Sequence, residues 1–253
     1  MPSHNFYLFF INNFDVIQQG TPKSLLLGIL WSVAVEEQFY LCWPLLMSLV
    51  PIRYMKVLCL TILLGSLTFR YLHRSEPVVL YFHTFSVIGD MALGGLMAVY
   101  TASKSRFLNW VAGLNKLEIA CIYAGALFLI FFKHKIFYFP LINVFERIII
   151  AVFFGMIIVE QNFSRASFFK FSNWKFASRL GIYTYGLYCL HFLGIYLGLR
   201  LLTLLPFHDT KAGIFVFQPL ISFALSIGIS LFSYHYFEKR FLAYKNRFAY
   251  IVK

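Results

Sequence analysis

The sequence predicts an all-α fold: a polytopic membrane helix bundle of about seven transmembrane helices, with the N-terminus outside and the C-terminus cytoplasmic. The first observation is composition, because 60% of the 253 residues are hydrophobic, only 13% are charged, and the mean hydropathy is +0.73. Soluble domains are about 45–50% apolar and about 25% charged, so the composition excludes a soluble globular domain and a disordered chain. The other two observations are apolar runs of spanning length and basic residues in the gaps between them.

The apolar runs define the expected helices, since ~20 apolar residues cross the ~30 Å hydrocarbon core. An aromatic segment at 6–14 is too short to span, and we expect either the end of another helix or an interfacial segment there. No linker separates the runs, so residues 1–253 are predicted to form a single membrane domain. The seven runs are 24–50, 55–72, 79–101, 117–132, 138–160, 178–204 and 213–237.

The orientation follows from the basic residues, which are more frequent in cytoplasmic loops. The net charge of +12 lies mostly in short gaps between spans, which argues against nucleic-acid binding. One side carries Lys23, Arg70, Arg74, Lys133, Lys135 and Lys211. The richer side, predicted to be cytoplasmic, carries Arg53, Lys56, Lys104, Arg106, Lys116, Arg165, Lys170, Lys175, Arg179, Lys239, Arg240, Lys245, Arg247 and Lys253.

The four cysteines lie inside apolar runs without paired spacing, and we expect small buried hydrophobic residues rather than disulfides. They are Cys42, Cys59, Cys121 and Cys189. The chain contains no HExxH or CxxC pattern, so no metal site is predicted.

The first run contains two adjacent carboxylates, Glu36 and Glu37, in WSVAVEEQFYLCWP. On a helix Ser32, Glu36 and Tyr40 form one polar stripe, and Pro44 is expected to kink or end the helix. A charge inside a membrane costs at least ~2.5–3.5 kcal/mol, so such a residue has a function or a partner. Glu36 either faces a polar cavity, where it holds a base or an acceptor hydroxyl, or is a structural carboxylate.

Two further spans carry charges for which a structural role is the favoured interpretation. Asp90 lies in a helix whose glycines, Gly89, Gly94 and Gly95, allow close packing. The neighbours Glu146 and Arg147 do not share a helix face, so each is expected to pair elsewhere.

The last two runs carry an aromatic face and an acidic end. Tyr185, Tyr188 and His191 lie on roughly one helix face, which binds a sugar, carries a proton, or contains a satisfied core histidine. Glu238 precedes a basic tail that fits a stop-transfer signal, or a cytoplasmic site for a phosphorylated donor.

Four segments resemble the acyltransferase-3 family, the integral membrane O-acyltransferases of bacterial envelopes. The first is similar to the pattern Trp-Ser-Leu-x-Val-Glu-x-x-Phe-Tyr followed by Pro, with Val33 in place of Leu. The second, TYGLYCLH, is similar to Ser-Tyr-x-x-Tyr-x-x-His, with Thr184 in place of Ser. SYHYFEKRFL resembles the closing segment, with Arg240 where Pro is usual, and the Asp90 helix matches except for Ile88 in place of Arg. The residues matching the first pattern are Trp31, Ser32, Val35, Glu36, Phe39, Tyr40 and Pro44.

Members of that family usually have about ten helices with both ends cytoplasmic, and an upstream Arg and His of which the His is thought to be catalytic. No such pair precedes Trp31. The resemblance therefore implies that this chain is the C-terminal portion of such an enzyme and lacks roughly three N-terminal helices. A truncated gene, a mis-called start and a split protein are the three explanations.

The implied activity is transfer of an acyl group, chiefly acetyl, from acyl-CoA to a hydroxyl of a cell-envelope saccharide. The implied setting is the inner membrane of a bacterium, with acyl-CoA, the saccharide and lipid as partners, no bound cofactor and no nucleic acid. The resemblance assigns Glu36 as catalytic and Asp90 and Glu238 as structural or donor-side. The implied substrate-binding residues are Trp31, Ser32, Tyr40, Tyr185, Tyr188 and His191.

Two alternatives remain open at the level of sequence. A saccharide transporter or lipid-linked sugar flippase would use the same glutamate and tyrosines without consuming acyl-CoA. An inactive truncated remnant would do neither. The acceptor sugar, the acyl group and the oligomeric state are not predicted.

Overall fold

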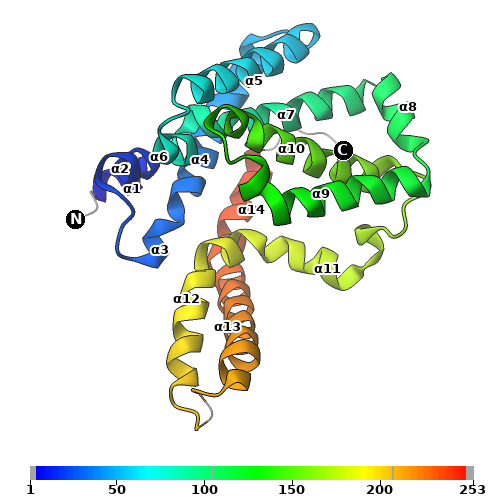
Figure 1. Ribbon diagram of the computed structural model, residues 1–253. Coiled ribbons are helices and arrows are strands. Elements are labelled where there is room, and N and C mark those ends of the chain that lie inside the picture. The colour runs from blue at the N-terminus through cyan, green and yellow to red at the C-terminus, as the bar shows by residue number, and fades with distance from the viewer. Residues whose placement is uncertain (1–3, 104, 207, 249–253) are drawn as a thin grey trace. The chain divides into compact units, whose positions relative to one another are not determined.

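The computed structural model describes residues 4–103, 105–206 and 208–248, and it is 84% helical with no strand among those residues (Figure 1). The all-α prediction is therefore confirmed. The chain forms two compact units, residues 4–22 with 30–171 and residues 23–29 with 172–248, which are described separately. The prediction of one membrane domain stays a prediction.

The first unit contains nine α-helices and a 3₁₀ turn, Ile52–Tyr54, among its described residues. Helix α5 packs along α7, and α10 packs against both α7 and α9. The α-helices are α1 (His4–Leu8), α2 (Asn12–Gln19), α4 (Leu30–Leu49), α5 (Met55–Leu72), α6 (Pro77–Phe82), α7 (Thr84–Ala102), α8 (Arg106–Ala112), α9 (Lys116–Ile136) and α10 (Pro140–Phe163).

Glycines bring α7 close to its neighbours in the first unit. A Cβ on Gly89 would lie 2.8 Å from Ser66 Oγ of α5, and one on Gly95 would lie 3.2 Å from the Trp43 ring of α4. Small residues allow this approach because they have little side chain between the helix backbones. Such close packing matters in a membrane, where lipid supplies no hydrophobic driving force for helix association. Gly94 faces open space, so its predicted packing role is wrong.

The second unit is built around a hairpin of α12 (Thr184–Leu202) and α13 (Gln218–Ser233), which lie side by side in Figure 1. Cβ atoms on Gly194 and Gly198 would clash with the hydroxyls of Ser226 and Ser222. The serines therefore fill the space that the glycines leave. The other elements are α3 (Leu25–Gly28), α11 (Lys175–Leu180), a 3₁₀ turn (Gly181–Tyr183), π-helical turns (Gly213–Phe217 and Tyr234–Glu238) and α14 (Lys239–Phe248).

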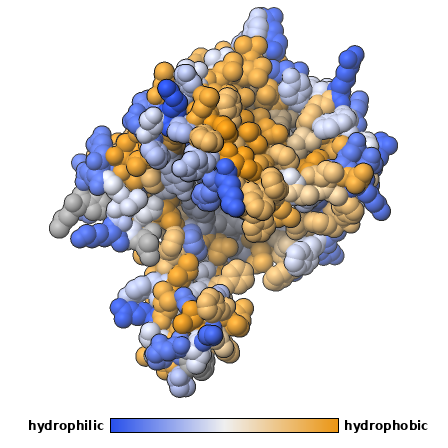
Figure 2. Space-filling model, viewed as in Figure 1, coloured by the Kyte–Doolittle hydropathy of each residue, from blue (hydrophilic) through white to orange (hydrophobic). Residues whose placement is uncertain are grey.

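Six helical stretches among the described residues are long and apolar enough to cross a membrane. Only 11% to 28% of each apolar window is buried within the protein, and hydrophobic residues cover broad areas of the face seen in Figure 2. An exposed apolar surface of this extent, on helices of spanning length, is typical of a protein surrounded by lipid. The stretches are Ile52–Leu72, Pro77–Ala102, Lys116–Ile136, Pro140–Phe163, Lys175–Leu202 and Gly213–Tyr244. They indicate a multi-pass α-helical membrane protein, while the count of seven and the orientation stay predictions.

The first predicted run, 24–50, differs most from the expectation. It divides at Ile29 between α3 and α4, and α4 continues five residues beyond Pro44, so Pro44 does not end the helix. Two glutamates and a glutamine lower its hydropathy below that of the six stretches. The last run extends past its predicted end at 237, because helical backbone continues through Glu238 into α14.

Three further expectations need correction or fall outside the described residues. Cys59 is buried, but Cys42 and Cys121 are exposed on apolar helix surfaces, so the prediction of burial is wrong for both. Arg70 belongs to a spanning stretch rather than to a loop, and therefore drops out of the charge count for topology. Lys104 and Lys253 lie outside the described residues.

Candidate functional site

The polar stripe predicted for the first run lies on α4. Its neighbouring face is buried, since Val33, Ala34 and Val35 have at most 6% of their surface exposed. Glu36 is partly buried, and no hydrogen bond or ion pair reaches its carboxylate from the residues that the structure describes. Tyr40 is 58% exposed. A carboxylate without a protein partner on an apolar helix is able to accept a hydrogen bond from a ligand.

The other side of α4 is anchored by Gln38, which sequence reasoning missed. Gln38 Nε2 donates to the Phe10 carbonyl at 2.6 Å and to Asn13 Oδ1 at 3.0 Å. Its Oε1 accepts from Thr84 Oγ1 at 2.6 Å, and Thr84 in turn accepts from Asn13 Nδ2 at 3.0 Å. Gln38 follows Glu36 by two residues, about 200° around the helix. The network therefore fixes the rotation of α4 without using Glu36.

Helix α2 contributes polar rather than apolar residues to this interface. Asn12, Asn13 and Asp15 are buried, although the preceding turn exposes apolar side chains. Burial and the nearby charge of Asp15 raise the pKa of Tyr7 above its usual range. The aromatic segment 6–14 thus contributes to two short helices, α1 and α2, and α2 buries polar side chains.

Trp31 directly precedes the stripe residue Ser32 and packs on aromatic rings of α6. Its ring centroid lies 5.1 Å from that of Tyr81 and 5.0 Å from that of Phe82. Such contacts orient the indole and leave α4 and α6 in a defined register. Ser32, the next residue, has an interaction of its own and lies one turn before Glu36.

Asp90 of α7 forms an ion pair with Arg147 of α10. Asp90 Oδ2 accepts from Arg147 Nη2 at 2.6 Å and from Nε at 2.9 Å. The prediction that Arg147 pairs away from Glu146 is confirmed. Oδ2 is committed to the guanidinium, which favours the structural role over a donor-side one, while the buried Oδ1 has no hydrogen-bond partner among the described residues.

Arg70 lies beside this pair and is 2% exposed. Its guanidinium donates to backbone carbonyls of Val144 and Asn143, both at 2.7 Å, and to Ser86 Oγ at 2.7 Å. Two carbonyl oxygens of α10 and a hydroxyl of α7 therefore solvate this charge. The sequence offered no signal for this role beyond a single arginine near a span end.

In the second unit, Tyr185, Tyr188 and His191 all lie on α12, and both tyrosine rings are exposed. His191 Nδ1 lies 2.6 Å from the carbonyl oxygen of Tyr188. A carbonyl only accepts, so Nδ1 carries the proton and Nε2 of the neutral ring presents a lone pair. This tautomer suits a hydrogen-bond acceptor or a base.

Glu238 lies close to Gly186, near the start of α12 and within the segment that carries the predicted aromatic face. Its Oε1 accepts from Ser233 Oγ at 3.1 Å and lies 2.6 Å from the place of a Cβ on Gly186. The carboxylate belongs to a π-helical turn, a distortion common near functional residues. The two motifs of the second unit are thus adjacent.

A second missed cluster surrounds Glu160, which has no exposed surface. Its carboxylate accepts from Ser167 Oγ at 2.5 Å and from Tyr123 Oη and Gln161 Nε2 at 3.0 Å each. Lys170 Nζ donates to the carbonyls of Glu160 and Gln161 at 3.1 Å and 2.7 Å. The cluster attaches residues 164–171 to the end of α10. The polar sequence after the fifth run was its only sequence signal.

The candidates therefore fall into two sets, one in each unit. The first holds Trp31, Ser32, Glu36 and Tyr40 on α4 with Asp90 on α7, and the second holds the α12 face with Glu238. Within residues 4–103, 105–206 and 208–248, no three His, Cys, Asp or Glu side chains gather as a metal site requires. No family model, curated protein or solved structure matches the chain.

Proposed function

We propose that this chain is a membrane O-acyltransferase that transfers an acyl group, chiefly acetyl, from acyl-CoA to a hydroxyl of a cell-envelope saccharide. The observation that supports this most is the carboxylate of Glu36, which has no partner within the described part of the chain and lies inside the segment WSVAVEEQFYLCWP, which resembles the acyltransferase-3 signature. The proposal includes the inner membrane of a bacterium as the location.

In the proposed reaction the saccharide oxygen attacks the thioester carbonyl. A new ester C–O bond forms, the C–S bond to CoA breaks, and the hydroxyl proton passes to a base while the CoA sulfur leaves as a thiolate. Glu36 accepts a hydrogen bond from the acceptor hydroxyl, or orients the base that takes its proton. Fixing α4 through Gln38 holds the carboxylate in place at no cost to its own hydrogen-bonding capacity.

Aromatic residues in each unit offer surfaces suited to a sugar. In the first unit these are Trp31 and Tyr40 on α4, and in the second unit they are Tyr185 and Tyr188 on α12, all with apolar ring faces and polar tips. His191 with a free Nε2 lone pair accepts a hydroxyl hydrogen. Asp90 supports this arrangement indirectly through its ion pair with Arg147.

The test is labelled acetyl transfer by membranes from cells that express the gene at its native locus, compared with a deletion strain. Label from acetyl-CoA is expected in the envelope polysaccharide of the expressing strain only, with equimolar release of CoA thiol. Uptake of the saccharide into vesicles without thiol release would instead support a transporter. Absence of both would support an inactive remnant, and either outcome overturns the proposal.

A further inference from the structure

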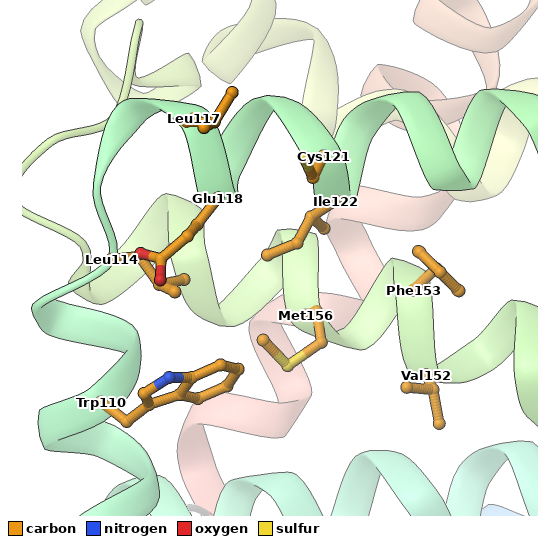
Figure 3. Close-up of a pocket in the computed structure, with 9 residues that line it drawn as sticks. All are labelled: Trp110, Leu114, Leu117, Glu118, Cys121, Ile122, Val152, Phe153 and Met156. Atoms are coloured by element: carbon orange, nitrogen blue, oxygen red, sulfur yellow. The ribbon is translucent and has the colours of Figure 1, made fainter.

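An open apolar groove lies between α8, α9 and α10 of the first unit, with a cavity volume of about 500 Å³. Figure 3 shows its lining: Trp110 from α8, Cys121 and Ile122 from α9, and Val152 and Met156 from α10. Trp110 is 54% exposed. The groove is therefore open at the surface of the protein, and its walls belong to a well-packed unit.

The size and chemistry of the groove suit a hydrocarbon chain. Apart from the Glu118 carboxylate and the indole N–H, the lining side chains offer almost no polar atoms. A water molecule's share of the liquid is about 30 Å³, so the cavity corresponds to on the order of 15 non-hydrogen atoms. That is about the number of carbon atoms in one fatty acyl chain. A sugar or a nucleotide would leave its polar groups without partners here.

The groove begins where the apolar stretch Lys116–Ile136 begins, which places one end at the boundary of the hydrocarbon. Trp110 is the residue type that favours this level, because its ring is apolar and its N–H is polar. A chain lying in the groove therefore has its polar end at the N-terminus of α9.

Two exposed cations neighbour lining residues along the chain, Lys116 beside Leu117 and Arg106 one turn before Trp110. Lys116 is the first residue of α9, and Arg106 precedes Trp110 by one helical turn on the same face of α8. Neither forms an ion pair with a residue that the structure describes. Glu118 is the acidic residue nearby, but its Oε2 accepts from the Asn115 backbone N–H at 2.8 Å in a capping box. The cations complement a phosphate.

We propose that this groove binds a phospholipid of anionic headgroup, with one acyl chain against Trp110, Ile122 and Met156 and the phosphate between Arg106 and Lys116. The occupant is a membrane lipid, because the groove opens on a surface that itself faces lipid. The inference is independent of the proposed acyl transfer.

The test measures lipid retained by the full-length protein after exchange into detergent with equal amounts of phosphatidylglycerol and phosphatidylcholine of matched chains. Native mass spectrometry counts the bound lipids. Wild type is expected to retain one phosphatidylglycerol in preference to phosphatidylcholine. The double variant Arg106→Gln/Lys116→Gln is expected to lose at least about fivefold of that preference, since each basic residue near an anionic headgroup contributes to it. The control is Lys135→Gln at the other end of α9, which should change nothing.

A second variant tests the groove itself. Cys121→Trp fills the cavity and is expected to abolish retention of both lipids, whereas Leu127→Trp, on the exposed surface of α9 outside the groove, leaves retention unchanged. Equal retention of the two lipids by wild type overturns the inference. So does unchanged retention in a Cys121→Trp protein that elutes as a single folded species. If that variant does not fold, the charge variant alone decides.

Discussion

Gln38 of α4 and Thr84 of α7 are joined by a 2.6 Å hydrogen bond across 46 residues of sequence. With Asn13 and the Phe10 carbonyl, it ties α4 to α2 and α7 on the side away from Glu36. A helix held this way presents Glu36 in one orientation while its carboxylate stays available. The proposed catalytic role of Glu36 depends on this anchoring.

Replacing Gln38 with Leu should destabilise the protein by roughly 1–3 kcal/mol, because Asn13 and Thr84 lose partners in a buried setting. The measurement is the thermal unfolding midpoint in a mild detergent. Gln18→Leu, on the exposed face of α2, is the matched control and should change the midpoint little. An unchanged midpoint in Gln38→Leu would show that the network does not hold α4.

Arg70→Lys should also lower stability, by about 2 kcal/mol or more, although the charge is conserved. A lysine has three donors at one point and cannot reach the carbonyls of Val144 and Asn143 together with Ser86. Arg74→Lys, at an exposed position, should cost little. Thermal unfolding of both variants checks this. Equal unfolding midpoints for Arg70→Lys and Arg74→Lys would argue against a stabilising role for the hydrogen bonds of Arg70.

Much of the helical architecture follows from hydropathy, but the solvation of charges inside it does not. The apolar runs predicted the spanning helices because their length and composition are local properties. Arg70 donates to carbonyls 10 to 74 residues away, and Glu160 accepts from Tyr123, 37 residues away. These contacts form only when the helices pack, so no local stretch of the sequence indicates them.

The candidate site likewise combines features that the sequence predicts with contacts that only the structure shows. The helical period placed Ser32, Glu36 and Tyr40 along α4, and the pairing of Arg147 away from Glu146 followed from their adjacency. The contact of Glu238 with Gly186 joins segments about 50 residues apart, and Gln38 gave no signal among polar neighbours. The functional roles stay predictions, since neither the fold nor the comparisons test them.

Gly194→Ala should weaken the α12–α13 hairpin by about 1–3 kcal/mol. A Cβ there would lie 2.7 Å from the backbone N and Cα of Ser226, so the helices would have to separate. Gly228→Ala, which faces open space on α13, should be neutral. Unfolding in increasing sodium dodecyl sulfate compares the two, and equal resistance would contradict the close approach.

Glu160→Gln should release the segment 164–171. An amide has one oxygen where the carboxylate has two, and its NH₂ group would face a donor such as Ser167 Oγ or Tyr123 Oη. Trypsin is expected to cut after Lys170 several-fold faster than in wild type. Glu76→Gln, at an exposed position, serves as the control, and identical digestion rates in all three proteins would show that Glu160 does not hold this segment.

The most direct test of the catalytic assignment compares Glu36→Gln with Glu37→Gln, because both remove one carboxylate from the same turn of α4. Both genes are placed at the native locus, protein amounts are equalised by immunoblot, and labelled acetyl transfer to envelope polysaccharide is measured. Glu36→Gln is expected to lower transfer by about 100-fold or more, as for loss of a group that handles the hydroxyl proton, while Glu37→Gln keeps most of it. Acetyl transfer at the wild-type level by the Glu36→Gln variant would contradict the catalytic role of Glu36.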